Sequence, residues 1–150
     1  KRHGGAFTHG VRRGRRRGAN RDMVIGIGVD IVQVDRMQKA SEKQRFLCRV
    51  FTERERAYAA SRSIPAQSYA GMFAAKEAAA KALGSGFSGF GPDAVEILHD
   101  ASGAPSLKLH GAAKNRAETL GVENAFVSIA HDGGLAMAEV ILEGSHAKSV

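Results

Sequence analysis

An alanine-rich segment from Ala66 to Leu83, followed directly by Gly84, constrains the fold more than any other feature of the sequence. Alanine has the highest helix propensity, and a glycine just after the last turn is typical of a helix end. The segment therefore predicts one long helix. One side of this helix carries the predicted core positions, which are Met72, Ala75, Ala79, Ala82 and Leu83.

The opposite side of this predicted helix carries two alanines and two charged residues, Ala70, Ala74, Glu77 and Lys81. Glu77 and Lys81 are four residues apart in the favourable order, so the simplest interpretation is a helix ion pair that contributes about 0.3–0.5 kcal/mol. The alanines indicate another possibility, because small side chains let a ligand or a second backbone approach closely. Both interpretations stay open on spacing alone.

Shorter elements are predicted on both sides of the long helix. Residues 23–29 form a β-branched run interrupted by glycines, which predicts a buried strand with close backbone approach, ended by Asp30. Residues 34–50 look helical with an interruption near Ala40, and Thr52 to Glu55 is a capping box that starts a helix to about Ala60. Strands are expected at 94–99 and 106–110, a helix at 111–120, and a final hairpin at 126–130 and 135–142. This order predicts an α+β domain with a mainly antiparallel sheet packed with helices.

Composition sets limits on the class of protein. A length of 150 residues suits one domain, and the sequence contains no run of about 18 apolar residues that would predict a membrane span. The single cysteine, Cys48, excludes an internal disulfide framework. With no tryptophan and 6% aromatic residues, a stacking platform for single-stranded nucleic acid is not expected.

The net charge of +7 is confined to the first 22 residues, which hold eight of the 22 basic residues and one of the 15 acidic residues. Residues 1–22 are rich in glycine and arginine and predict a disordered basic extension, with the folded domain at 23–150. The extension is interpreted as an upstream segment before Met23 or as a transit segment. It lacks the apolar centre of a secretory signal, so we expect a cytoplasmic protein.

Four ionisable residues stand beside glycines or at strand ends: Asp30, Glu77, Lys81 and His131. On local pattern alone Asp30 suits a helix N-cap and His131 an exposed turn. Brought together, the two carboxylates would suit one hard cation such as Mg²⁺, while Lys81 and His131 would neutralise phosphate. The glycine-rich loop from Gly84 to Gly91 is a further candidate, because its backbone N–H groups could bind phosphate, although a simple connector is the commoner use.

Three segments of the sequence resemble the signatures of one family, the holo-acyl-carrier-protein synthases, which are short 4′-phosphopantetheinyl transferases. The first is Ile25-Gly26-Ile27-Gly28-Val29-Asp30-Ile31-Val32 with Arg36, the second runs from Phe73 to Gly86, and the third is Val127-Ser128-Ile129-Ala130-His131-Asp132. The resemblance covers about residues 23–143. It implies the α+β fold of these transferases and a trimer with active sites between subunits.

The resemblance also implies a reaction, in which 4′-phosphopantetheine passes from coenzyme A to a serine of apo acyl carrier protein for fatty acid biosynthesis. Adenosine 3′,5′-bisphosphate is the other product. Carried over by motif, Asp30 and Glu77 would bind Mg²⁺ on the coenzyme A diphosphate, and Lys81 and His131 would contact phosphates. These four residues form the expected catalytic set, and the backbone of Gly84, Ser85 and Gly86 would line the nucleotide site.

The acidic helix of an acyl carrier protein requires a basic docking face. Because residues 23–150 are neutral overall, that face must come from local clustering. We expect it at Arg36, Arg45 and Arg49, with Arg45 and Arg49 on one side of a helix. Met37 and Phe46 would supply an apolar centre within this charged rim. A merely solvated basic helix edge is the alternative.

Two positions depart from the family pattern, and two other functions are alternatives. Met72 stands where many relatives carry arginine, and Ala104 stands where a basic residue is frequent. A nucleic-acid-binding module would explain the basic extension but nothing in residues 23–150, so neither nucleic acid nor membrane is an expected partner. An inactive interaction protein on the same scaffold is disfavoured by the intact Asp30, Glu77 and Lys81.

Overall fold

The computed structural model describes residues 23–145, so the expectation of disorder at 1–22 lies outside the described part of the chain. The three longest strands form one antiparallel sheet in the order β1 (Met23–Gln33), β5 (Leu135–Gly144), β4 (Val122–Asp132). A second antiparallel sheet pairs β2 (Val95–His99) with β3 (Pro105–Leu109). The helices are α1 (Val34–Ser41), α2 (Gln44–Val50), α3 (Glu53–Ala60), α4 (Pro65–Ala82), the 3₁₀ turn η1 (Pro92–Ala94) and α5 (Gly111–Leu120). The predicted α+β class with antiparallel pairing is confirmed.

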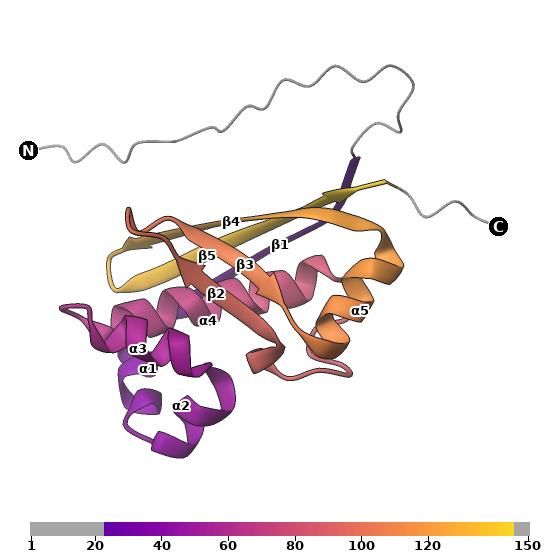
Figure 1. The fold of residues 1–150 in the computed structure, drawn as a ribbon. Helices are drawn as coiled ribbons and strands as arrows, with labels where there is room; N and C mark the ends of the chain where they lie inside the picture. The colour runs from indigo at the N-terminus through magenta and orange to yellow at the C-terminus, as the bar shows by residue number, and fades with distance from the viewer. Residues whose placement is uncertain (1–22, 146–150) are drawn as a thin grey trace, which may run out of the picture.

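The long helix α4 lies along one face of the three-stranded sheet (Figure 1). Gly26 and Gly28 of β1 make this packing possible, since a Cβ atom on either would meet a backbone carbonyl of α4, that of Ala82 or Ala78. The helix backbone therefore rests directly on the strand at these glycines. The close backbone approach expected from the glycine-interrupted strand is confirmed. The expected burial of this strand is wrong, because only its α4 side is covered and Ile27 and Val29 on the other side are exposed.

Helix α4 is buried on nearly every side. The predicted core positions are buried, but so are Ala70 and Ala74, which the sequence placed on the opposite face. The reason is tertiary: the sheet covers one side of α4, while α1, α3 and β2 pack on the others. Small side chains on this second side let those elements approach, which is the second of the two roles predicted for them.

Local signals place the short elements correctly. The Thr52 hydroxyl accepts a hydrogen bond from Glu55 N, and the Glu55 carboxylate accepts one from Thr52 N, so the predicted capping box starts α3. Pro65 is the first residue of α4. Strands β4 and β5 join through Gly133 and Gly134, both with positive φ, as expected of a tight hairpin.

One boundary differs from the prediction in a way that matters for the site. Asp30 does not end the first strand or cap a helix, because β1 continues to Gln33 and Asp30 pairs with Ala138 of β5. The pairing with β5 prolongs the strand beyond the predicted segment 23–29. Asp30 is half-buried on the α4 side of β1, while its neighbours Val29 and Ile31 are exposed on the other side.

The face of the sheet away from α4 is exposed and carries many large apolar side chains, with Glu139 of β5 beside Val29 among them. It carries Ile27, Val29 and Ile31 from β1, Phe126 from β4, and Leu135 and Met137 from β5. The strand register places Ile27 and Phe126 on either side of Ile141, and Ile31 beside Met137. We call these residues the apolar sheet face. Among the described residues, no helix is long and apolar enough to cross a membrane.

Candidate active site

The packing of α4 against β1 brings Asp30 and Lys81 together, although they are 51 residues apart in the chain. Lys81 Nζ lies 2.9 Å from Asp30 Oδ1 and donates a second hydrogen bond of 2.9 Å to the carbonyl oxygen of Val29. The ammonium group is therefore held at the strand while its side chain remains half-exposed. Lys81 does not pair with Glu77, so the simple helix ion pair is not the arrangement found.

Glu77 lies one turn before Lys81 on α4 and is half-buried. Burial raises the pKa of its carboxyl group, the negative charge of Asp30 raises this pKa further, and the Lys81 ammonium opposes the rise. Asp30 and Glu77 are thus close enough for their charges to repel. Two such carboxylates are the donor type that a hard divalent cation prefers, so this donor set fits Mg²⁺.

The number of protein ligands available also agrees with Mg²⁺ at this site. Within residues 23–145, no group of three or more histidine, cysteine and acidic side chains is placed to hold a metal ion. A cation bound here would take two protein carboxylates, and its remaining ligands would be water and substrate oxygens. Mg²⁺ is commonly held in this way with phosphate substrates.

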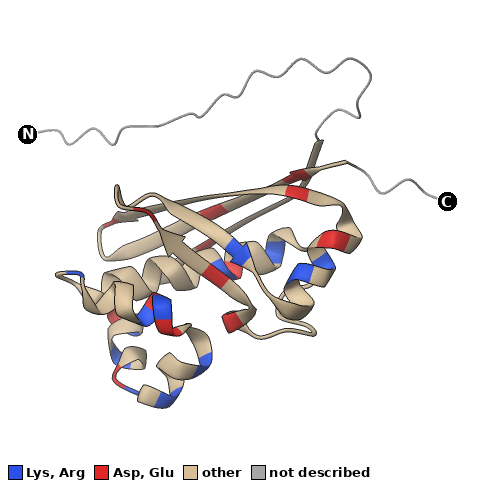
Figure 2. Cartoon of the chain, viewed as in Figure 1, with Lys and Arg blue, Asp and Glu red and all other residues tan. Residues whose placement is uncertain are grey.

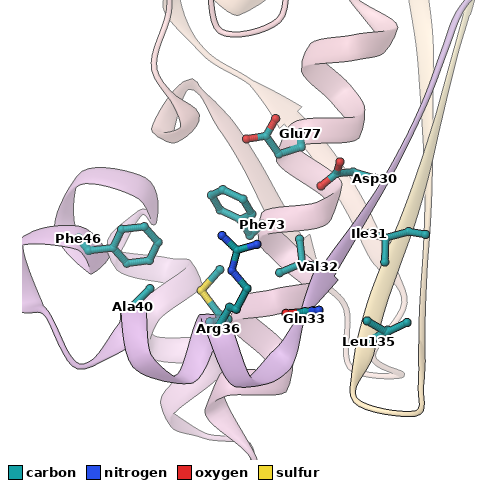
Figure 3. Close-up of a pocket in the computed structure, with 11 residues that line it drawn as sticks. Asp30, Ile31, Val32, Gln33, Arg36, Ala40, Phe46, Phe73, Glu77 and Leu135 are labelled. Atoms are coloured by element: carbon teal, nitrogen blue, oxygen red, sulfur yellow. The ribbon is translucent and has the colours of Figure 1, made fainter.

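Asp30 and Glu77 border a cavity of about 580 Å³ (Figure 3). Its wall comes from β1, α1, α2, α4 and β5, and the Arg36 side chain extends across it towards Phe73. The lining residues are Asp30, Ile31, Val32, Gln33, Arg36, Met37, Ala40, Phe46, Phe73, Glu77 and Leu135. The cavity thus combines carboxylates at one end with an arginine and an apolar wall.

His131 lies apart from these residues within the chain. Its Nε2 atom is 3.0 Å from the carbonyl oxygen of Gln67, near the beginning of α4. Gln67 and Glu77 are ten residues apart on the helix, which is about 15 Å along its axis. His131 borders a second cavity of about 210 Å³, together with Tyr58, Ser68, Gly71, His99, Gly103, Pro105 and Ile129. One chain therefore gathers three of the four predicted catalytic residues.

The predicted nucleotide-lining segment, Gly84 to Gly86, directly follows α4. Gly84 and Gly86 have positive φ values of 74° and 56°, which glycine adopts more readily than any other residue. Gly86 N donates to Ala80 O, and Arg116 Nε from α5 donates to Leu83 O at 3.1 Å. These bonds fasten the beginning of the loop to the helix end, a few residues after Lys81.

A second lysine–carboxylate pair was missed in the sequence. Lys76 and Glu55 are fully buried, with Nζ and Oε1 2.9 Å apart, and burial lowers the pKa of Lys76 while Glu55 opposes this. The signal was present, because Lys76 lies four residues after Met72 and three before Ala79, on the core stripe. A lysine on such a stripe indicates a buried partner.

The predicted docking residues are exposed. Arg36 lies on α1, and Arg45 and Arg49 lie on α2. Figure 2 shows basic segments at the helical end of the molecule formed by α1 and α2. Met37, expected as part of an apolar centre there, is instead buried in the core, because it lies on the inner side of α1 against α4. Phe46 is half-buried and borders the cavity.

The two departures from the family pattern also have places in the structure. Met72 is buried in the core of α4, so an apolar side chain fills the space at that position. Ala104 N donates a hydrogen bond of 3.0 Å to Asp100 Oδ1 in the turn between β2 and β3. This turn therefore forms without a basic side chain at 104.

Comparisons with known proteins identify the family of this chain. The family model of the 4′-phosphopantetheinyl transferase superfamily matches residues 26–138. A holo-[acyl-carrier-protein] synthase of Solidesulfovibrio magneticus is 50% identical over 125 residues, covering 81% of this chain and 100% of that protein. A synthase of the same name from Anaeromyxobacter dehalogenans is 43% identical over 132 residues, covering 82% of this chain and 98% of that protein.

Solved structures give the same result. The crystal structure of holo-[acyl-carrier-protein] synthase from Neisseria meningitidis aligns with a TM-score of 0.72 at 32% identity, over 80% of this chain and 98% of that one. The synthase from Bacillus anthracis, solved in complex with CoA (3′,5′-ADP), aligns with a TM-score of 0.69 at 32% identity, over 82% and 99%. The chain therefore belongs to the 4′-phosphopantetheinyl transferase superfamily and, within it, to the holo-[acyl-carrier-protein] synthases.

Proposed function

We propose that this enzyme transfers 4′-phosphopantetheine from coenzyme A to a serine of an apo acyl carrier protein, with Mg²⁺, in the cytoplasm, for fatty acid biosynthesis. The observation that carries the proposal is the meeting of Asp30, Glu77 and Lys81 beside one cavity, at the positions of two family signatures. The relatives named above are synthases of this type, and the Bacillus anthracis structure contains the coenzyme A nucleotide.

The reaction forms a bond between the serine oxygen and the phosphorus that carries pantetheine. The bond from this phosphorus to the bridging oxygen of the diphosphate breaks, adenosine 3′,5′-bisphosphate leaves with that oxygen, and the serine gives up its proton. Asp30 and Glu77 would hold Mg²⁺, which when bound neutralises diphosphate charge. Lys81, fixed by Val29 O and Asp30, presents a positive charge where negative charge develops on the phosphate oxygens.

Transfer can be measured directly by mass spectrometry of an apo acyl carrier protein after incubation with coenzyme A, Mg²⁺ and this protein. The expected result is a mass gain of one phosphopantetheine group on the carrier protein. Chelation of the divalent cation should abolish the gain. Unchanged carrier mass across several carrier proteins would refute the proposed activity.

We further propose that the enzyme is a trimer whose active sites lie between subunits. The apolar sheet face supports this, because several large apolar side chains exposed on one strand surface are typical of an interface. Leu135 belongs to this face and also borders the cavity, so the interface would reach the site. His131, remote from Asp30 within one chain, would serve the cavity of a neighbouring subunit.

Sedimentation velocity tests the assembly with a matched pair of substitutions. Ile27→Glu places a charge on the apolar sheet face, where Ile27 is 62% exposed, and should dissociate the trimer. Ile64→Glu is the control, because Ile64 is 55% exposed but lies immediately before α4, outside the strands that form that face. A monomeric wild-type protein, or equal behaviour of the two variants, would contradict the assembly proposed.

The carrier protein is proposed to dock at Arg36, Arg45 and Arg49. All three side chains are exposed, and Arg36 also borders the cavity that holds Asp30 and Glu77. A carrier protein bound along α1 and α2 would therefore have its serine near these carboxylates. Phe46 and the apolar cavity wall, to which the largely buried Met37 also belongs, form the apolar part of this surface.

A further inference from the structure

The buried pair of Lys76 and Glu55 is unusual because charged side chains are rarely excluded completely from solvent. All three donors of the Lys76 ammonium are used: one to Glu55 Oε1 at 2.9 Å, one to Pro92 O at 3.0 Å and one to Val95 O at 2.6 Å. Glu55 Oε1 also accepts a hydrogen bond of 2.7 Å from Ile97 N. The pair is therefore fully satisfied in its surroundings.

These contacts fall on one short stretch of backbone, from Pro92 to Ile97. Val95 O and Ile97 N belong to β2, whose strand neighbour among the described residues is β3. The side chains of Lys76 and Glu55 thus occupy hydrogen-bonding positions that a neighbouring strand would otherwise fill. They fasten η1 and the beginning of β2 to helices α3 and α4.

The glycine-rich loop lies between the two places that Lys76 joins. It begins at Gly84, soon after α4 ends, and finishes at Gly91, immediately before Pro92. Gly84, Gly86 and Gly89 all have positive φ, and a chain with so many glycines has little conformational preference of its own. Its shape depends on how its two ends are held.

Each end of this loop is held by a separate set of contacts. The first end is fastened by Arg116 and by the bond from Gly86 N to Ala80 O. At the far end, Pro92 O accepts directly from Lys76, and Ala94 O accepts from His110 N. Lys76 is the residue next to Glu77, so one turn of α4 carries both a site carboxylate and the attachment of the loop.

We propose that Lys76 is a positioning residue, which with Glu55 holds the far end of the glycine-rich loop so that its backbone is ordered to receive the nucleotide part of coenzyme A. The claim that the loop receives coenzyme A rests on the proposed function. The claim that Lys76 and Glu55 order the loop does not. A buried ion pair is seldom needed for stability alone, since well-packed apolar residues often serve as well. An apolar side chain at position 76 could not donate hydrogen bonds to the carbonyl oxygens of Pro92 and Val95, as Lys76 does.

The test compares Lys76→Met with the double variant Glu55→Leu/Lys76→Met. Lys76→Met leaves the Glu55 carboxylate buried without its cation, which weakens the fold as well as the loop. The double variant removes both charges and should recover part of the melting temperature that Lys76→Met loses. It does not restore the bonds to Pro92 O and Val95 O, and it also loses the bonds that Glu55 accepts from Thr52 N and Ile97 N. Lys114→Met, at an exposed lysine of α5, is the matched control.

Two readouts are measured on the full chain. Amide hydrogen exchange in residues 84–95 should be faster in both Lys76 variants than in the wild-type protein and the control. The KM for coenzyme A should rise about tenfold in the double variant, equivalent to about 1.4 kcal/mol, while the KM for carrier protein stays nearly unchanged. The exchange measurement needs no turnover, so it decides the inference even if the protein transfers nothing.

A double variant with recovered melting temperature, wild-type exchange in residues 84–95 and an unchanged KM for coenzyme A would overturn the proposal. Equal rises in the KM values of both substrates would also overturn it, because the effect would then not be local to the loop. If neither Lys76 variant folds, the pair serves the whole fold and the specific positioning role is wrong.

Discussion

Helix α4 carries two lysines, each in an ion pair with a carboxylate of another element. The two pairs have the same N–O distance, but one is buried and the other is partly exposed to solvent. Lys76–Glu55 and Lys81–Asp30 both measure 2.9 Å, but the side chains of the first pair are 0% exposed and those of the second are 51% and 21% exposed. The donors of Lys76 are all used within the protein. Lys81 and Asp30 remain open to a ligand.

The difference shows that distance alone says little about what an ion pair does. A charge removed from water must be satisfied permanently, so the buried pair has one arrangement and holds backbone in place. A partly exposed pair contributes about 0–1 kcal/mol to stability, which lets its members exchange partners when a substrate arrives. We therefore expect substitutions in the two pairs to have opposite consequences for stability and activity.

The largest expected effect is on activity, at the exposed cluster. Asp30→Ala and Glu77→Ala should each abolish phosphopantetheine transfer without unfolding the protein, because each removes one of two carboxylates proposed to hold the cation. Transfer assays with excess Mg²⁺, beside circular dichroism spectra, check this. Retained turnover in either variant would remove the assignment of these residues as metal ligands.

The next effect is on stability, at the buried pair. Glu55→Gln leaves the Lys76 ammonium without an anion and should lower the free energy of unfolding by about 3–5 kcal/mol. The matched substitution in the exposed pair, Asp30→Asn, should lower it by less than about 1 kcal/mol. Denaturant unfolding at one fixed protein concentration compares the two. A similar loss of unfolding free energy in both variants would contradict the difference proposed between the two pairs.

Lys81→Ala sharpens the contrast between the two lysines. Its ammonium is proposed to offset charge that builds on phosphate during transfer, so kcat should fall on the order of a hundredfold. The apparent affinity for Mg²⁺ should change less than kcat. Stability should change by less than about 1 kcal/mol. An unchanged kcat with only a higher KM for coenzyme A would contradict this role.

The smallest effect is expected at the exposed arginines of α2. Arg45→Glu and Arg49→Glu together should raise the KM for carrier protein and leave the KM for coenzyme A nearly unchanged. The rise should shrink as salt concentration increases, because exposed charges act through screened attraction. Deletion of residues 1–22 is the comparison, with a weaker effect expected. A stronger effect of that deletion would move carrier recognition to the basic extension.

Much of this protein follows from local sequence. The beginnings of α3 and α4 and the β4–β5 hairpin each depend on residues near in the chain, such as Thr52, Pro65 and Gly133. Propensities, caps and turn residues act over a few positions, so a sequence pattern captures them. The family motifs likewise stand in continuous segments.

The tertiary structure alone decided which side chains meet. Asp30 was expected to end a strand, but pairing with β5 carried β1 past it and turned its carboxylate towards α4. Lys81 forms its ion pair with Asp30 rather than with Glu77. Lys76 forms one with Glu55, which lies 21 positions earlier in the chain. His131 lies beside Gln67, away from Asp30, Glu77 and Lys81. Contacts between distant segments depend on how whole elements pack, and local pattern does not contain that information.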